Sequence, residues 1–174
     1  MTKTKSARSG TIGRHRFHGA VERFDVVAQF IARRFPDQRY VADVAGGQGM
    51  LTRILNKRHN FECEVIDPRG SPLKGVPSRP ELFTPDMAAY YDLIVGLHPD
   101  EALRDVVHAA AIRPVVVVPC CNFWTSQERL GREELLEAIT RHHKLRGGTV
   151  ERQVLRFRGP HNHALILCPP TTSG

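Results

Sequence analysis

The sequence lacks an apolar run long enough to cross a membrane, which takes about 20 residues. Only four of its 174 residues are cysteines; none stands in a CxxC pair and two are adjacent, so no disulfide framework is indicated. No apolar stretch follows the basic N-terminus, so the pattern of a secretory signal is missing. We therefore expect a cytoplasmic protein with reduced thiols and no membrane association.

Acidic residues are also scarce, because 18 Asp and Glu stand against 25 Lys and Arg for a net charge of +7. A basic chain favours a polyanionic partner, although the charge is equally compatible with solubility alone. Residues 1–23 hold six cations and one acid. We predict a flexible basic arm over 1–19, a single domain over 20–170 and a tail over 171–174.

Strand-like and helix-like patterns alternate along the chain. Helices are expected over 20–35, 50–57, 100–111 and 126–143. Strands are expected over 40–45, 61–66, 81–84, 92–97, 114–118, 150–157 and 163–168. The last two strands lack room for a helix between them and should pair antiparallel. The alternation predicts an α/β fold with a mostly parallel sheet and helices on both faces.

A glycine-rich turn, Gly46-Gly-Gln-Gly49, follows the first strand, which carries Asp43 near its end. Gly47 and Gly49 let the backbone approach a ligand, and the amides of the next helix can face a carboxylate. Such turns serve many nucleotide folds. An acid before the turn disfavours a pyrophosphate and favours the amino group and sulfonium of S-adenosylmethionine. Thr52 also replaces the Gly or Ala of the dinucleotide fingerprint.

Two further acids follow later strands. Asp67 ends the second strand and can accept hydrogen bonds from both hydroxyls of a ribose; the alternative is a carboxylate that caps a turn. Asp86 can accept from an adenine amino group while Met87 packs on the ring; the alternative is helix capping by Asp86.

The segment from Asp43 to Gly49 resembles motif I of class I methyltransferases, with Ala45 where the family usually has its first glycine. The resemblance implies a Rossmann-like, seven-stranded sheet with a C-terminal antiparallel hairpin, and S-adenosylmethionine as cofactor. Asp67 and Asp86 match the family's ribose and adenine acids. The predicted cofactor-binding residues are Asp43, Ala45, Gly46, Gly47, Gly49, Asp67, Pro68, Asp86, Met87, Gly96 and Leu97.

A narrower resemblance concerns the segments that end the fourth and fifth strands, 95–100 and 118–123. They are similar to a methyltransferase family that includes eukaryotic tRNA 2′-O-methyltransferases, which implies an RNA substrate. This chain departs from that family in having Pro99-Asp100 where Cys-Gly is frequent, and in lacking zinc-binding CHHC modules.

The same two strand ends supply the predicted catalytic residues, because ligands of open α/β sheets bind beyond the carboxyl ends of the strands. These residues are His98, Asp100 and Asn122. His98 can act as a general base, or it can only hydrogen-bond the cofactor or the cysteine loop. Methyl transfer from a sulfonium needs little acid–base help, so positioning can dominate catalysis.

Cys120 and Cys121 allow three interpretations: packing, a nucleophile, or a metal site with His98 or His15. A nucleophile is disfavoured because no cysteine follows the fourth strand, and adjacent cysteines are poorly spaced for zinc. Packing of the loop is the preferred interpretation, and we predict no metal.

The remaining predicted substrate-binding residues are Arg14, Arg16, Phe17, Phe123 and Trp124, beside the two cysteines. The aromatic rings can stack on a base, or Phe123 can belong to the core with Trp124 covering it. The Arg14–Phe17 segment can bind phosphate, or it can be a solvated tail.

Together these features lead us to expect an S-adenosylmethionine-dependent methyltransferase acting on RNA, either tRNA or rRNA, by direct methyl transfer. A small-molecule or protein methyltransferase is the alternative. A third hypothesis is a non-catalytic cofactor-binding scaffold for a partner subunit, favoured if His98 and Asn122 cannot reach a substrate. A protein partner or a homodimer is compatible with the sequence.

Overall fold

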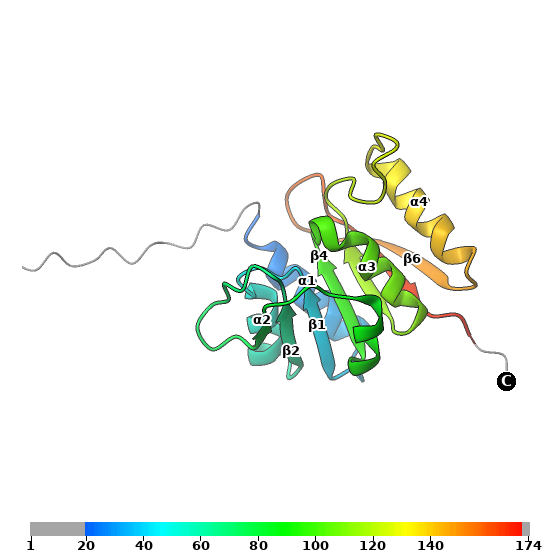
Figure 1. Cartoon of the computed structure of the whole chain (residues 1–174). Coiled ribbons are helices and arrows are strands. Elements are labelled where there is room, and N and C mark those ends of the chain that lie inside the picture. Colours follow the sequence, from blue (N-terminus) through cyan, green and yellow to red (C-terminus); the bar gives the residue numbers. More distant parts are fainter. Residues whose placement is uncertain (1–19, 172–174) are drawn as a thin grey trace, which may run out of the picture.

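A seven-stranded sheet in the order β3-β2-β1-β4-β5-β7-β6 forms the centre of the computed structural model, which describes residues 20–171 (Figure 1). The strands are β1 Tyr40–Val44, β2 Glu62–Ile66, β3 Ser78–Arg79, β4 Leu93–Leu97, β5 Val115–Val118, β6 Thr149–Val154 and β7 His163–Cys168. β1 to β5 run parallel, and β7 is antiparallel to both β5 and β6. The predicted fold class, including the C-terminal antiparallel hairpin, is confirmed.

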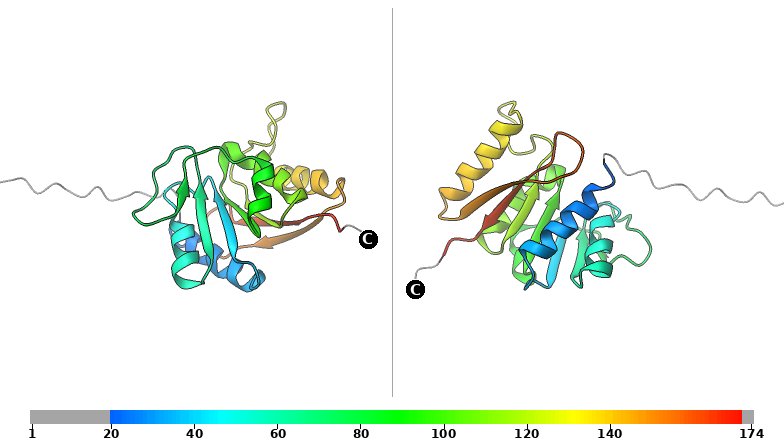
Figure 2. Two further views of the ribbon diagram at one scale, coloured as in Figure 1. Left: turned by 60° about the horizontal axis from the view of Figure 1, so that its bottom comes forward. Right: turned by 180° about the vertical axis from the view of Figure 1, so that it is seen from behind.

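The central strands carry apolar residues on both faces, so helices cover both sides of the sheet. α1 (Arg23–Arg34) and α2 (Met50–Arg58) pack on one face, against residues such as Val41. α3 (Leu103–His108) and α4 (Arg132–Lys144) pack on the other, against residues such as Ala42. Figures 1 and 2 show α1 and α3 on opposite sides of the sheet. Within residues 20–171, no helix has the length and apolar character that a membrane span requires.

The third strand lies earlier than the predicted 81–84. The amide of Val65 donates to the Pro77 carbonyl at 2.9 Å, and that of Asp67 donates to the Arg79 carbonyl at 3.1 Å. Pairing with β2 ends at Arg79, directly before Pro80. Residues 85–90 instead form a short 3₁₀ helix, η1 (Pro85–Tyr90).

Other predicted boundaries also shift. α4 begins at Arg132 rather than at 126, where Glu134 accepts a hydrogen bond from the Gly131 amide at 2.7 Å and so fixes the first turn. The segment predicted as one helix over 100–111 is divided into η2 (Asp100–Ala102), α3 and η3 (Ala109–Ala111). β6 ends at Val154 rather than at 157.

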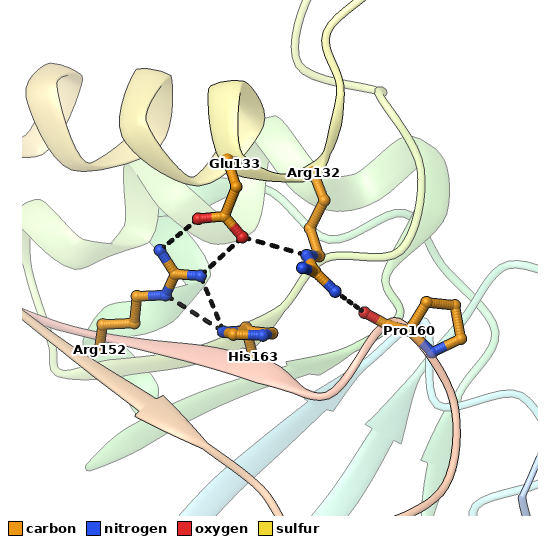
Figure 3. Close-up of polar contacts among 5 residues, drawn as sticks. All are labelled: Arg132, Glu133, Arg152, Pro160 and His163. Atoms are coloured by element: carbon orange, nitrogen blue, oxygen red, sulfur yellow. Dashed lines mark hydrogen bonds and ion pairs between the residues drawn. The ribbon is translucent and has the colours of Figure 1, made fainter.

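A polar network ties the start of α4 to the C-terminal hairpin (Figure 3). Arg152 forms a two-pronged ion pair with Glu133, at 2.7 and 2.9 Å, and its guanidinium also contacts His163 Nδ1. Arg132 bridges Glu133 and the Pro160 carbonyl, at 3.1 and 3.0 Å. The hydrogen bonds from Arg152 lower the pKa of Glu133 to about 2. The network thereby ties the start of α4 to β6, to β7 and, through the Pro160 carbonyl, to the loop between them.

Candidate functional site

A cavity of about 470 Å³ lies at the carboxyl ends of the parallel strands, beside the turn that follows β1. The strand order reverses here, because β1 connects to β2 on one side while β4 lies on the other. Open α/β sheets bind their ligands at such a switch point. Six predicted site residues line the cavity: Ala45, Asp67, Pro68, Asp100, Cys121 and Phe123. Its other lining residues are Arg69, Leu82, Phe83, Pro99, Glu101, Ala102 and Asp105.

The glycine turn has the tight backbone that its sequence predicts. A Cβ on Gly46 would lie 2.6 Å from the Asp43 carboxylate, and one on Gly49 would lie 2.6 Å from Val76 Cγ1. Gly49 has φ of +75° and Ala45 has φ of +55°. Ala45 therefore occupies a left-handed conformation at the position where methyltransferases usually have glycine.

The Asp43 side chain packs against the glycine turn at Gly46. Its side chain is 1 % exposed and accepts a hydrogen bond from Thr52 Oγ1 at 2.8 Å. Burial raises the pKa of Asp43 to about 6, against the Thr52 hydrogen bonds that lower it. Asp43 is not among the described residues that line the cavity, so any effect on a ligand acts through the field of its charge.

Asp67 is 2 % exposed, and both of its carboxylate oxygens already accept hydrogen bonds. The Gly47 amide donates to Oδ2 at 2.9 Å, and Arg69 donates from its amide and from two guanidinium nitrogens, at 2.7 to 2.9 Å. Burial opposes ionisation, yet these hydrogen bonds lower the pKa of Asp67. The predicted ribose acceptor is thus ionised and at the cavity wall, with the Arg69 guanidinium on it.

Several predicted cofactor residues lie away from this cavity. Asp86 is exposed and Met87 half-buried in η1, and neither lines it. The apolar wall comes instead from Leu82 and Phe83, which stand in the segment predicted to be a strand and which the sequence reasoning missed. Gly96 is buried within β4, where a Cβ would lie 3.0 Å from Val106 Cγ1. Its small size serves packing against α3.

His98 faces the loop between β6 and β7. Its Nε2 lies 3.0 Å from the His161 carbonyl, and its ring meets the Phe157 ring edge-on at 6.5 Å. A carbonyl only accepts, so Nε2 carries the proton. Burial lowers the pKa of His98, which favours the neutral ring. The partner is thus the loop between β6 and β7 rather than the cofactor or the cysteine loop, so this contact matches neither of the two predicted roles.

The cysteine loop does not form a buried cluster. Cys121 is exposed and lines the cavity, so the packing interpretation is wrong for it. Cys120 is half-buried and donates from Sγ to Asp100 Oδ1 at 3.2 Å. Burial and the adjacent Asp100 raise the pKa of the Cys120 thiol, which opposes a role as nucleophile. Asn122 is occupied within the loop, where its Nδ2 donates to the Glu128 carbonyl at 2.7 Å.

Two predicted aromatic substrate-binding residues, Phe123 and Trp124, lie in different surroundings. Phe123 is 40 % exposed and lines the cavity, whereas Trp124 packs edge-on against His142 at 4.8 Å, under the Arg104 guanidinium. Of these two rings, Phe123 is the one that borders the cavity. Arg14, Arg16 and Phe17 lie outside the described residues.

Solved structures share this architecture. The sugar N-methyltransferase KedS8 from Streptoalloteichus sp ATCC 53650 matches with a TM-score of 0.56 at 13 % identity, over 97 % of this chain and 98 % of that one. CalS10, an amino pentose methyltransferase from Micromonospora echinaspora solved with S-adenosylmethionine bound, has a TM-score of 0.54 at 14 % identity, over 84 % and 89 %. A Streptococcus thermophilus protein described as a hemolysin has a TM-score of 0.60 at 13 % identity, over 91 % and 71 %. No protein-family model and no curated protein matches the sequence.

These similarities define the class of fold. It is the Rossmann-like fold of class I methyltransferases, with its seven-stranded sheet and C-terminal antiparallel hairpin. At such identities the likeness extends to the fold alone, and function has to be argued from the site.

Proposed function

We propose that this protein is an S-adenosylmethionine-dependent methyltransferase. The observation that carries the proposal is the cavity at the switch point, which joins the motif I turn at Ala45, the buried carboxylate of Asp67 and the apolar side chain of Phe83. A nucleoside needs this combination, because its ribose hydroxyls require an acceptor and its base an apolar wall. The fold neighbour CalS10 binds S-adenosylmethionine, which supports the same cofactor here.

The cofactor's positive charge suits this end of the sheet. Asp43 and Asp67 both lie at the turn, and their mutual repulsion contributes to the raised pKa of Asp43, after burial. A sulfonium and an ammonium group relieve such repulsion, whereas a pyrophosphate adds to it. For Asp67 to accept ribose hydroxyls, the Arg69 guanidinium has to leave it. The Arg69 side chain is 64 % exposed, so it can turn into solvent when ribose hydroxyls replace it on Asp67.

For the acceptor we propose RNA, either tRNA or rRNA, following the similarity of segments 95–100 and 118–123 to tRNA 2′-O-methyltransferases. The net charge of +7 supports it. So does a groove between α1 and β6 that carries Arg33, Arg34 and Arg156. Cations arranged along an apolar groove suit a nucleic-acid backbone.

One observation favours a small-molecule acceptor instead. Asp100, Glu101 and Asp105 all line the cavity, and three carboxylates repel a phosphate. An amine-bearing acceptor fits that wall, and KedS8 and CalS10 methylate sugars. The scaffold hypothesis is favoured by the internal hydrogen bonds of His98 and Asn122, although Asp100 and Cys121 still reach the cavity.

The test uses S-adenosylmethionine tritiated in its methyl group, with RNA, protein and low-molecular-mass fractions from cells lacking the gene. We expect label in the RNA fraction with the wild type and none with Asp67→Ala. Label in the small-molecule fraction alone would refute the RNA proposal. Absence of label from all fractions, together with tight S-adenosylhomocysteine binding, would favour the scaffold.

A further inference from the structure

Two neighbouring strands bring a carboxylate and two thiols together. β4 and β5 run parallel with Leu97 opposite Val118, so the residues after them emerge at the same edge of the sheet. Asp100 stands three residues after Leu97, and Cys120 and Cys121 follow Val118 and Pro119. The three side chains each offer one donor atom, and these atoms lie within 4.8 Å of one another.

The separation of these donors suits a metal ion. A tetrahedral zinc with Zn–S bonds of about 2.3 Å and a Zn–O bond of about 2.1 Å places its donors about 3.6 Å apart. Cys120 Sγ and Asp100 Oδ1 are 3.2 Å apart, and the Cys121 donor lies within 4.8 Å of both, so a bound ion would draw the Cys121 donor inward. We propose that Asp100, Cys120 and Cys121 form a three-ligand binding site for Zn²⁺.

The donor set selects the metal. Two thiolates favour a borderline-soft ion such as Zn²⁺ over Mg²⁺ or Ca²⁺, which prefer oxygen ligands. The sequence offers His98 or His15 as the third ligand beside the two adjacent cysteines, whose spacing disfavours zinc. Asp100 supplies that ligand from the next strand, a juxtaposition that sequence spacing does not reveal.

The fourth position of this site opens toward the cavity, because Asp100 and Cys121 both line it. Three protein ligands with an open position are typical of catalytic rather than structural zinc. The role that follows depends on the proposed function. Zinc would bind an acceptor hydroxyl and ease loss of its proton to solvent. An oxygen lone pair then forms the bond to the methyl carbon, and the electrons of the breaking carbon–sulfur bond remain on sulfur.

The test is zinc binding by the full chain, purified without an affinity tag, stripped by a chelator and kept reduced. We expect one zinc per chain by mass spectrometry and by competition titration. Asp100→Asn, Cys120→Ser and Cys121→Ser should each weaken binding at least tenfold. Two matched controls should leave it unchanged: Cys168→Ser, a half-buried thiol outside the group, and Asp105→Asn, an acid in the same cavity.

A second measurement covers variants that fail to fold. Co²⁺ added to the stripped wild type should give a thiolate-to-metal charge-transfer band, which Cys168→Ser retains. A wild type that binds no zinc, or controls that lose as much affinity as the three ligand variants, would overturn the site. Calorimetry with S-adenosylhomocysteine on stripped protein separates the two proposals. Cofactor binding without any zinc binding would refute only the proposed metal site. Zinc binding without cofactor binding would refute the proposed methyltransferase function.

Discussion

The buried carboxylate of Asp43 should lower the stability of the folded protein at neutral pH, and Asp43→Asn tests this. Burial raises its pKa from 3.8 to about 6, so the charged form is disfavoured in the folded state relative to the unfolded one. The shift of about two units corresponds to a penalty of about 3 kcal/mol. That penalty is present in full above pH 6 and disappears as the pH falls through 6 toward 3.8.

Urea unfolding of the wild type and of Asp43→Asn at pH 8 and pH 5 measures the effect. The asparagine keeps an oxygen to accept from Thr52, and its advantage over the wild type should shrink by about 1.5 kcal/mol between pH 8 and pH 5. This pH dependence is the diagnostic quantity, because an imperfect fit of the amide changes both measurements equally.

Asp92→Asn provides a control in which stability should change with pH in the opposite direction. Hydrogen bonds from the Tyr40 and Arg39 amides lower the pKa of Asp92, so its contribution to stability is lost as the pH falls. A difference between Asp43→Asn and the wild type that does not change with pH would refute the assignment of a desolvated carboxylate.

Four further predictions concern the site. Asp67→Ala should abolish S-adenosylhomocysteine binding in calorimetry while the circular dichroism spectrum stays native; wild-type affinity would exclude Asp67 as ribose acceptor. Arg69→Ala should tighten that binding, because the guanidinium that hydrogen-bonds the buried Asp67 carboxylate no longer competes with the ribose hydroxyls; a large loss of affinity would make Arg69 a ligand. His98→Asn should lower kcat less than tenfold, because Asn tolerates the φ of +55° and a general base would cost about 10²- to 10⁴-fold. Removal of residues 1–19 should flatten the salt dependence of RNA binding by about two units of slope, without changing cofactor affinity; an unchanged slope would leave the small-molecule acceptor as the better hypothesis.

The fold was predictable because its signals are local. Val115–Val118 and Leu93–Leu97 are unbroken apolar runs, as strands buried on both faces require. The antiparallel hairpin followed from the short connection between its strands. The third strand was misplaced because its position depends on hydrogen bonds to β2, and the apolar Leu82–Phe83 pair suggested a strand where the structure has a cavity wall.

By itself the sequence determined the strand–turn–helix unit around Asp43 to Gly49 and the acid at Asp67, because chain connectivity alone places them at one end of adjacent parallel strands. Which side chains face the cavity was decided only by tertiary structure. His98 turns to the His161 carbonyl and Arg69 covers Asp67, while Asp100 meets Cys120 across two strands. These contacts join residues through rotamers and loop conformations that no spacing in the sequence encodes. They were therefore visible only once the sheet had fixed the positions of the loops.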